Sequence, residues 1–236
     1  MRAKEFLSRY GVQFEPVNIA GNADGQSRLL SHGLESVPAV CLDDECVPGG
    51  DLGAVARLLE LDYKPPARLT PGGLFAKWML VLDAVQRYVK QAPFEGLSHK
   101  SPDRDRTFRE LGWHIVLIPR AFVTAYDANE FPNRLFAEKD VSVELTGADI
   151  ASAVVESQRV VEAWWRDAGS QDPLDRVLET YWGAHTLLES FEREVWHTAQ
   201  HARQVMMFLR QLAIEPDRPL TADDLAGLPL PEGVWD

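Results

Sequence analysis

The chain has 236 residues, of which 45% are hydrophobic and 25% charged, a balance typical of a globular protein and not of a disordered or fibrous one. Its 24 Lys and Arg are outnumbered by 36 Asp and Glu, and the formal charge of −12 disfavours binding to nucleic acid. The longest apolar run, Trp78 to Leu82, is far short of the ~20 residues of a membrane span, and neither a leader nor a disulfide framework is evident. We therefore expect a cytoplasmic protein with no nucleic-acid or membrane partner.

The first part of the chain alternates short helices with strand-like segments. Apolar side chains at helical spacing predict a helix from Arg2 to Tyr10, which Gly11 ends. Weak alternation of apolar and polar residues predicts a strand from Val12 to Ile19. A short helix is expected from Ser27 to His32.

A hairpin and a third helix follow. Val37 to Leu42 and Glu45 to Val47 flank Asp43-Asp44, a pattern typical of two strands joined by a tight turn. Asp51 is expected to cap a helix from Leu52 to Leu61, because its carboxylate can accept a free N–H at the positive end of the helix dipole.

The two cysteines, Cys41 and Cys46, lie on opposite sides of this turn. A cross-strand disulfide is geometrically feasible, because residues at these positions face each other. The alternative, which we favour, is that both are small buried hydrophobic side chains on one strand face.

The order helix–strand–helix–strand–strand–helix over roughly residues 2–62 resembles the glutaredoxin branch of the thioredoxin fold. Most of the resemblance lies in the segment SVPAVCLDDECVPGGDLGAVARLL. It implies a cis peptide bond before Pro38, and it implies that glutathione contacts Val37, Pro38, Gly50 and Asp51. Glutaredoxins also have a first strand and a Cys-x-x-Cys motif ahead of the first helix, and this sequence has neither. We therefore expect bound glutathione, and not a protein dithiol, to supply the thiol.

A change of composition marks a boundary between residues 63 and 68. Pro65 and Pro66 cannot continue a helix and favour an extended link. The sequence predicts a truncated glutaredoxin-like α+β domain over residues 1–64 and an all-α domain over residues 65–236.

Four long helical segments are predicted in the second part. They run from Thr70-Pro71 to Ala92, from Ser101-Pro102 to about Tyr126, from Thr146 to near Gly169, and from Leu174 to about Ile214. An extended piece near Val177 to Tyr181 is an option within the last segment, and residues 128–144 would form a long crossover. Four amphipathic helices without regular strands predict a four-helix bundle.

Three histidines fall on the apolar faces of two of these helices. His197 and His201 are four residues apart, so both leave one side of a helix and can bind the same metal ion. Val205 and Phe208 continue this face, and His114 interrupts the apolar stripe of the second helix. Burying an imidazole without a partner costs about 1–3 kcal/mol, and a shared metal ion removes that cost.

One histidine in the second helix, together with His-x3-His in the fourth and the sequence ARQVMMFLRQL after it, is similar to the DinB/YfiT-like metalloprotein superfamily. The resemblance spans roughly residues 70–214 and implies that His114, His197 and His201 bind a divalent metal. Zinc is the expected metal, with nickel and iron as alternatives, and three ligands leave room for water or substrate. Glu194 is a candidate catalytic general base or an orienting partner of His197, and an ion pair with a neighbouring arginine is the alternative.

The two resemblances together suggest a metal-dependent transferase or isomerase that uses glutathione and acts on a small electrophile. The first alternative is a metal-dependent hydrolase with metal-bound hydroxide as nucleophile, and the second is a non-catalytic metal-binding stress-response protein. The expected partners are a small-molecule substrate and a low-molecular-weight thiol. A homodimer could also form, since the seven tryptophans leave enough apolar surface.

Overall fold

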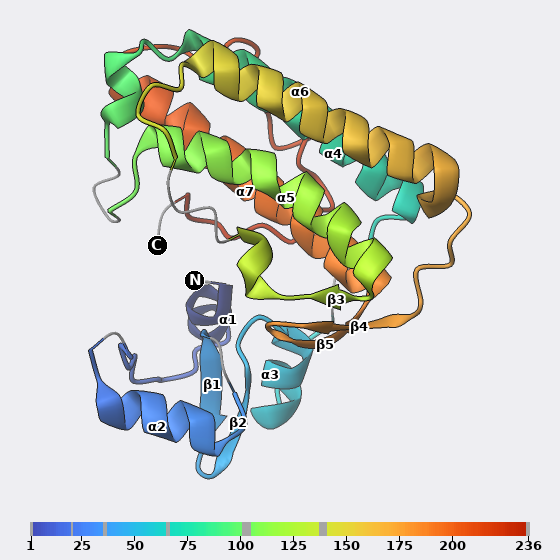
Figure 1. Cartoon of the computed structure of the whole chain (residues 1–236). Coiled ribbons are helices and arrows are strands. Elements are labelled where there is room, and N and C mark those ends of the chain that lie inside the picture. Colours follow the sequence, from blue (N-terminus) through green and yellow to red (C-terminus); the bar gives the residue numbers. More distant parts are fainter. Residues whose placement is uncertain are drawn as a thin grey trace. The chain divides into compact units, whose positions relative to one another are not determined.

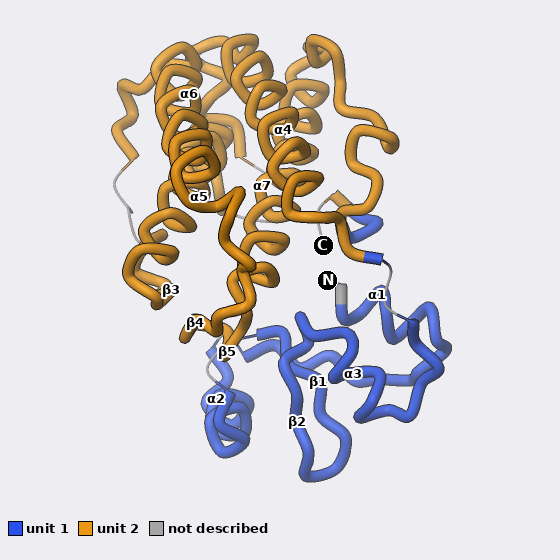
Figure 2. Tube along the Cα trace, turned by 90° about the vertical axis from the view of Figure 1, so that its right-hand side faces the viewer, with its two compact units in different colours: residues 1–67, 231–233 blue, residues 68–230, 234–236 orange. Residues whose placement is uncertain are grey.

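The computed structural model describes residues 2–19, 21–34, 37–64, 67–100, 105–136 and 141–234. Within these ranges the protein is rich in helix and mixed in class, with α-helices and a few short strands. It divides into two compact units, Met1–Ala67 with Pro231–Gly233 and Arg68–Leu230 with Val234–Asp236 (Figure 2). We call them the N-terminal unit and the helical unit. The expected boundary at residues 64 and 65 lies next to this division, and the expected link at Pro65 and Pro66 lies outside the described residues.

The N-terminal unit is small. Its elements are α1 (Arg2–Arg9), α2 (Ala23–Ser31), β1 (Ala39–Leu42), β2 (Glu45–Pro48) and α3 (Leu52–Leu58) (Figure 1). The strands are antiparallel, and Asp43 has a φ of 52° in the turn between them. The peptide bond between Val37 and Pro38 is cis. The buried core comprises Phe6, Leu7, Val55 and Ala56.

The predicted strand at residues 12–19 is wrong. These residues join no ladder, and most of their side chains are exposed. A strand exists only where a neighbour satisfies its N–H and C=O groups. Within the described part of this unit, β1 and β2 pair only with each other, so the segment has no such neighbour.

The lengths of two helices also differ from the prediction. Helix α2 begins at Ala23, ahead of the expected Ser27, because the Asn22 side chain accepts the hydrogen bond that caps it. Helix α3 ends at Leu58 and not at Leu61. Both differences concern the ends of elements whose presence the sequence does predict.

Cys41 and Cys46 form a disulfide between β1 and β2. The interpretation that we favoured, two buried hydrophobic thiols, is therefore wrong, and the cross-strand bond is correct. Cys41 is exposed and Cys46 is half-buried. The register of the hairpin explains the bond, because it puts the two residues directly opposite each other with their Cα atoms 4.1 Å apart.

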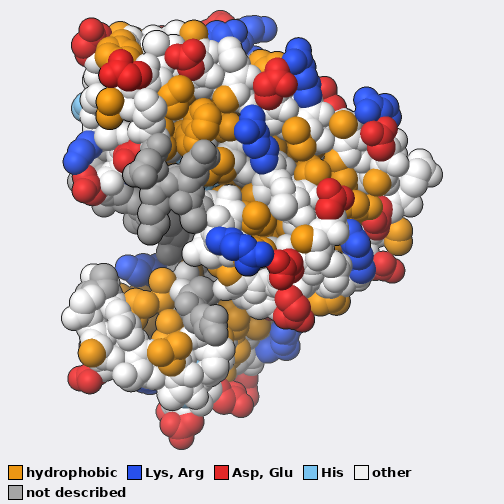
Figure 3. Space-filling view, viewed as in Figure 1, with side chains coloured by type: hydrophobic (Ala, Val, Ile, Leu, Met, Phe, Trp, Pro, Cys, Tyr) orange, Lys and Arg blue, Asp and Glu red, His pale blue; other side chains and the backbone are white. Residues whose placement is uncertain are grey.

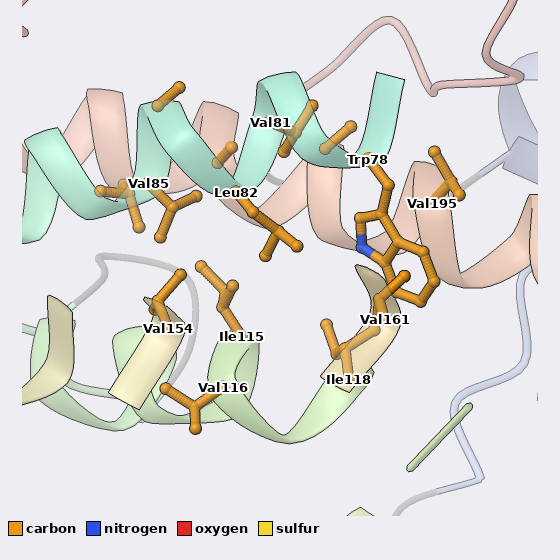
Figure 4. Packing of buried hydrophobic residues seen from close by; sticks show 14 of the residues in the cluster. Trp78, Val81, Leu82, Val85, Ile115, Val116, Ile118, Val154, Val161 and Val195 are labelled. Atoms are coloured by element: carbon orange, nitrogen blue, oxygen red, sulfur yellow. The ribbon is translucent and has the colours of Figure 1, made fainter. Parts of the chain in front are cut away.

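Four long helices form most of the helical unit. They are α4 (Pro71–Gln91), α5 (Phe108–Ala128), α6 (Gly147–Trp164) and α7 (Leu187–Gln211), with short helical turns at η1 (Glu95–Ser98), η2 (Asn133–Phe136) and η3 (Trp165–Gly169). Both α4 and α5 pack against α6 and α7, so the four helices enclose one core (Figure 1). Trp78, Leu82, Ile115 and Val154 meet there and are fully buried (Figure 4).

Helix α5 starts later than predicted. It begins at Phe108, where Thr107 and Glu110 form a reciprocal capping box, and not at the Ser101-Pro102 signal. Each of the two residues accepts a hydrogen bond from the other's backbone N–H, which satisfies two donors at the helix end. Residues 101–104 themselves lie outside the described ranges.

A three-stranded sheet in the helical unit was not predicted. It consists of β3 (Glu130–Phe131), β4 (Val177–Thr180) and β5 (Gly183–Thr186), in the order β3-β4-β5. β4 confirms the optional extended piece near Val177 to Tyr181, and its hairpin with β5 replaces the expected start of the last helix. Helix α7 therefore begins only at Leu187, after its cap Thr186. β3 lies in the expected crossover, of which residues 137–140 fall outside the described ranges.

On the face shown in Figure 3, acidic and basic side chains of the helical unit are interspersed, and apolar side chains are scattered between them. Among the described residues, no helix combines the length and apolarity that crossing a bilayer requires.

Candidate metal centre

The three histidines expected to bind a metal come together between α5 and α7. His114 comes from α5, and His197 and His201 leave α7 one turn apart. Each offers one ring nitrogen, and these three nitrogens all lie within 4.8 Å of one another. The ring centroids are 4.6–5.3 Å apart, with His197 and His201 the closest pair. This is the spacing at which three imidazoles can share a single ion.

Burial keeps the three imidazoles neutral. Desolvation lowers the pKa of His114 to about 2, and the nearby His197, Arg106 and Arg193 reinforce the shift. Desolvation also lowers the pKa of His197 and, more strongly, that of His201. A neutral imidazole presents one lone pair, which is the form that binds a metal.

One atom of the cluster fits a metal directly. The Nε2 atom of His201 is buried and has no hydrogen-bond partner, although Nδ1 of the same ring is hydrogen-bonded. Leaving such an atom buried costs about 1–3 kcal/mol. A metal ion beside it would satisfy the lone pair, and the set of three nitrogen donors suits zinc, nickel or iron.

Glu194 is the hydrogen-bond partner of His197. Its side chain is fully buried, and its Oε2 lies 3.2 Å from Nδ1 of His197. Its Oε1 accepts a hydrogen bond from Arg193. Burial by itself raises the pKa of Glu194, but the charge of Arg193 and the bond with His197 outweigh it, and the pKa is lowered. The ionised carboxylate holds the proton of His197 on Nδ1, so Nε2 of His197 is left for the metal.

Arg193 is itself held in place by aromatic side chains. It donates a hydrogen bond to the hydroxyl of Tyr181 at 2.8 Å and lies 4.0 Å from the centre of the Trp182 ring. Both aromatic residues belong to the turn between β4 and β5. The unexpected hairpin therefore supports the residue that neutralises Glu194.

A pocket of about 220 Å³ opens beside His114. Its walls combine aromatic and aliphatic side chains with three charged ones. The lining residues are Asp105, Arg106, Glu110, Trp113, His114, Leu117, Phe136 and Val141. Because His114 belongs to both the cluster and the wall, a small molecule in this pocket would lie next to the metal position.

The residues expected to contact glutathione lie together at one end of the hairpin of the N-terminal unit. The backbone N–H of Gly49 donates to the carbonyl of Pro38 at 2.7 Å, which brings residues 37–38 next to residues 49–51. Val37, Pro38, Gly50 and Asp51 are all exposed. The predicted cap is present, since Oδ1 of Asp51 accepts from the N–H of Ala54 at 2.9 Å. One carboxylate oxygen of Asp51 is thus already engaged.

Several residues of this centre are absent from the sequence-based prediction. Gln204 contacts His201, Tyr181 contacts Arg193, and Arg106 lines the pocket. The ion pair between Arg193 and Glu194 is the one that the sequence offered as an alternative role for Glu194. Gln204 had a detectable signal, because a residue three positions after His201 lies on the same side of a helix. Tyr181 and Trp182 in the turn between β4 and β5 had no such signal, since only the tertiary fold brings them to Arg193.

No family model matches the chain, and no curated protein matches it. The resemblances to glutaredoxins and to the DinB/YfiT-like superfamily therefore rest on the residues quoted above.

Proposed function

We propose that the protein is a metal-dependent transferase or isomerase that uses glutathione, or a similar low-molecular-weight thiol, and acts on a small electrophile. In this proposal the helical unit is a DinB-like four-helix bundle, and the N-terminal unit is a truncated glutaredoxin-like domain. The observation that carries the proposal is the half-buried cluster of His114, His197 and His201, whose nitrogens lie within 4.8 Å.

The three histidines would hold the metal through neutral nitrogens. A bound divalent ion would act as a Lewis acid and lower the pKa of a thiol or water in an open position. Because the three ligands carry no charge, an anionic ligand would be favoured there, and a thiolate is such a ligand. Zinc is the expected metal, with nickel and iron as alternatives.

Glu194 suits an orienting role better than that of a general base. Both of its oxygens already have partners, Arg193 and His197, and its side chain has no exposure to the pocket or to solvent. A general base needs an oxygen within reach of the proton it removes. Glu194 would therefore act by fixing the ring of His197 and the position of its proton.

The pocket beside His114 would hold the substrate. Trp113, Leu117 and Phe136 give it apolar walls, which would bury a small carbon skeleton and exclude water. Arg106 contributes a positive charge at the same wall. A volume of about 220 Å³ limits the substrate to a small molecule.

Glutathione is assigned to the N-terminal unit because of the exposed residues at the end of its hairpin. Val37 would pair through its backbone with the peptide part of the thiol, and Gly50 and Asp51 would meet the γ-glutamyl end. Val37 is 56% exposed, and a Cβ added at Gly50 would meet no atom within 4 Å. Both are thus accessible to a ligand from solvent.

Calorimetry with glutathione tests this proposal. We expect the zinc-loaded protein to bind glutathione, and Val37→Glu to weaken binding at least ~10-fold because it adds a negative charge beside an anionic ligand. Leu30→Glu is the matched control, since Leu30 is 62% exposed on α2 and is not one of the expected glutathione contacts. If the zinc-loaded protein does not bind glutathione, the proposal that it uses this thiol is wrong. Turnover without any added thiol would favour the hydrolase.

A further inference from the structure

Gln204 is a buried polar residue next to the metal centre. It lies on α7 and is only 6% exposed. Its Oε1 lies 2.6 Å from Nδ1 of His201, and its Nε2 donates to the backbone carbonyl of Val234 at 3.0 Å. Both ends of the carboxamide are therefore engaged, one by the cluster and the other by the C-terminal segment.

The carbonyl of Val234 decides which way this amide points. A carbonyl oxygen only accepts hydrogen bonds, so it must face the NH2 group of Gln204 and not its oxygen. If the amide were turned around, two acceptors would face each other, which is unfavourable. The main chain at Val234 therefore directs Oε1 of Gln204 toward His201.

The orientation of the amide in turn decides the tautomer of His201. Oε1 can only accept, so Nδ1 of His201 must carry the proton. The lone pair then lies on Nε2, the buried atom that has no hydrogen-bond partner. This is the nitrogen that a metal would bind in the cluster.

We propose that Gln204, anchored by the main-chain carbonyl of Val234, is a positioning residue that fixes the ring of His201 with its Nε2 lone pair facing the metal position. The inference rests on the proposed metal centre and adds a residue that orients one of its ligands, His201. It assigns the C-terminal segment a role in the centre, although this segment contributes no ligand.

The rings of the two histidines of α7 would thus be oriented by different kinds of hydrogen-bond partner. Glu194 lies three residues before His197 and holds it with a charge, whereas Gln204 lies three residues after His201 and holds it with a neutral amide. Gln200 provides a natural control. Its Nε2 also donates to the carbonyl of Val234, at 2.8 Å, while its Oε1 accepts from Arg203 and not from a histidine.

The tautomer can be measured without any metal. In the metal-free protein, long-range ¹H–¹⁵N correlation spectra should report a proton on Nδ1 of His201. In Gln204→Leu this preference should disappear, and Gln204→Glu should restore it, because a carboxylate also accepts from Nδ1. Gln200→Leu should leave it unchanged. An unchanged tautomer in Gln204→Leu would overturn the inference, and if that variant did not fold, a proton on Nε2 in the wild type would do so.

Zinc affinity, measured by competition with a chromophoric chelator, is the second readout. We expect Gln204→Leu to lose roughly 10–100-fold in affinity, the range found when the partner of a ligating histidine is removed. We expect Gln204→Glu to lose less affinity than Gln204→Leu, because its carboxylate accepts from Nδ1 of His201 but cannot donate to the carbonyl of Val234. A chain that ends at Gly233 lacks the anchoring carbonyl and should lose affinity as well, and full affinity in that chain would overturn the role of Val234.

The two proposals fail in different ways. A wild-type protein with the expected tautomer but no zinc binding would contradict the proposed function and leave the positioning of His201 in place. A wild-type protein that binds zinc with the same affinity as Gln204→Leu would contradict the positioning role alone.

Discussion

The two units of the chain differ in what stabilises each of them. The helical unit buries whole aromatic side chains, among them Trp78, Phe122 and Phe191, in one continuous core. Among the described residues of the N-terminal unit, the buried cluster has four members, and a disulfide links the two strands. Close packing fixes side-chain geometry to a fraction of an ångström, which a metal centre needs. The difference explains why the histidine cluster lies in the helical unit, while the proposed thiol contacts of the other unit are exposed backbone and turn residues.

Removing a large core side chain should show the difference in packing between the two units most clearly. Trp78→Ala should lower the free energy of unfolding of the helical unit by about 3–5 kcal/mol, because it leaves a cavity and breaks the hydrogen bond from the indole to Thr198. Chemical denaturation followed by circular dichroism would measure this change. Leu42→Ala, at a 46% exposed residue of the hairpin, should change stability by less than about 0.5 kcal/mol. Equal losses of stability in the two variants would contradict the difference in packing between the units.

Replacing Glu194 tests whether the helical unit positions its histidines as argued. Glu194→Gln keeps the size of the side chain but removes the charge that Arg193 neutralises and His197 contacts. We expect zinc affinity to fall roughly 10–100-fold, measured with a competing chelator. Glu189→Gln, on the same helix but at its cap, is the control and should leave the affinity within about threefold. A normal affinity in Glu194→Gln would argue against the carboxylate as the partner of His197.

Acid should destabilise the metal-free helical unit. Burial lowers the pKa of His114 from 6.5 to about 2, so between these pH values the unfolded chain binds a proton that the folded chain does not. Stability is thus highest above pH 6.5 and is lost as the pH falls toward 2. His114 alone should account for about 2 kcal/mol between pH 6.5 and 5. Urea titrations with a chelator present would measure the slope, which should be shallower in His114→Gln. An equal slope in both proteins would contradict the buried neutral state.

The disulfide should matter only for the N-terminal unit. Replacing both Cys41 and Cys46 by serine removes a cross-link that closes a very short loop, which is worth about 2 kcal/mol in the unfolded-chain model. Hydrogen exchange of the amides of β1 and β2 should speed up accordingly. Zinc affinity should not change, and a loss of affinity would show that the two units are not independent in this respect.

The sequence predicts the histidine cluster well because local rules determine it. A spacing of four residues puts His197 and His201 on one side of any helix, and the apolar residues around them show that this side is buried. The caps at Thr70, Asp51 and Thr146 are local in the same sense, since each depends on its own helix end.

What the sequence does not predict depends on partners distant in the chain. β3 pairs with β4, nearly fifty residues further on, and β3 has only two residues, too few to signal a strand alone. The segment at residues 12–19 has the pattern of a strand but no neighbouring strand to pair with. The bond from Gln204 to Val234 spans 30 residues, and no local pattern indicates it. The start of α5 is different, since the capping box at Thr107 and Glu110 is a local signal that competes with Ser101-Pro102.

The most direct test of the metal centre is the stoichiometry and affinity of zinc in the wild type and in His114→Ala. We predict one zinc ion per chain in the wild type, and a loss of affinity of more than about 100-fold in His114→Ala, because removing a ligand costs more than removing its partner. His99→Ala, a histidine outside the cluster, should bind zinc as the wild type does. A wild-type protein that binds no zinc, nickel or iron, or a His114→Ala protein with wild-type affinity, would contradict the centre.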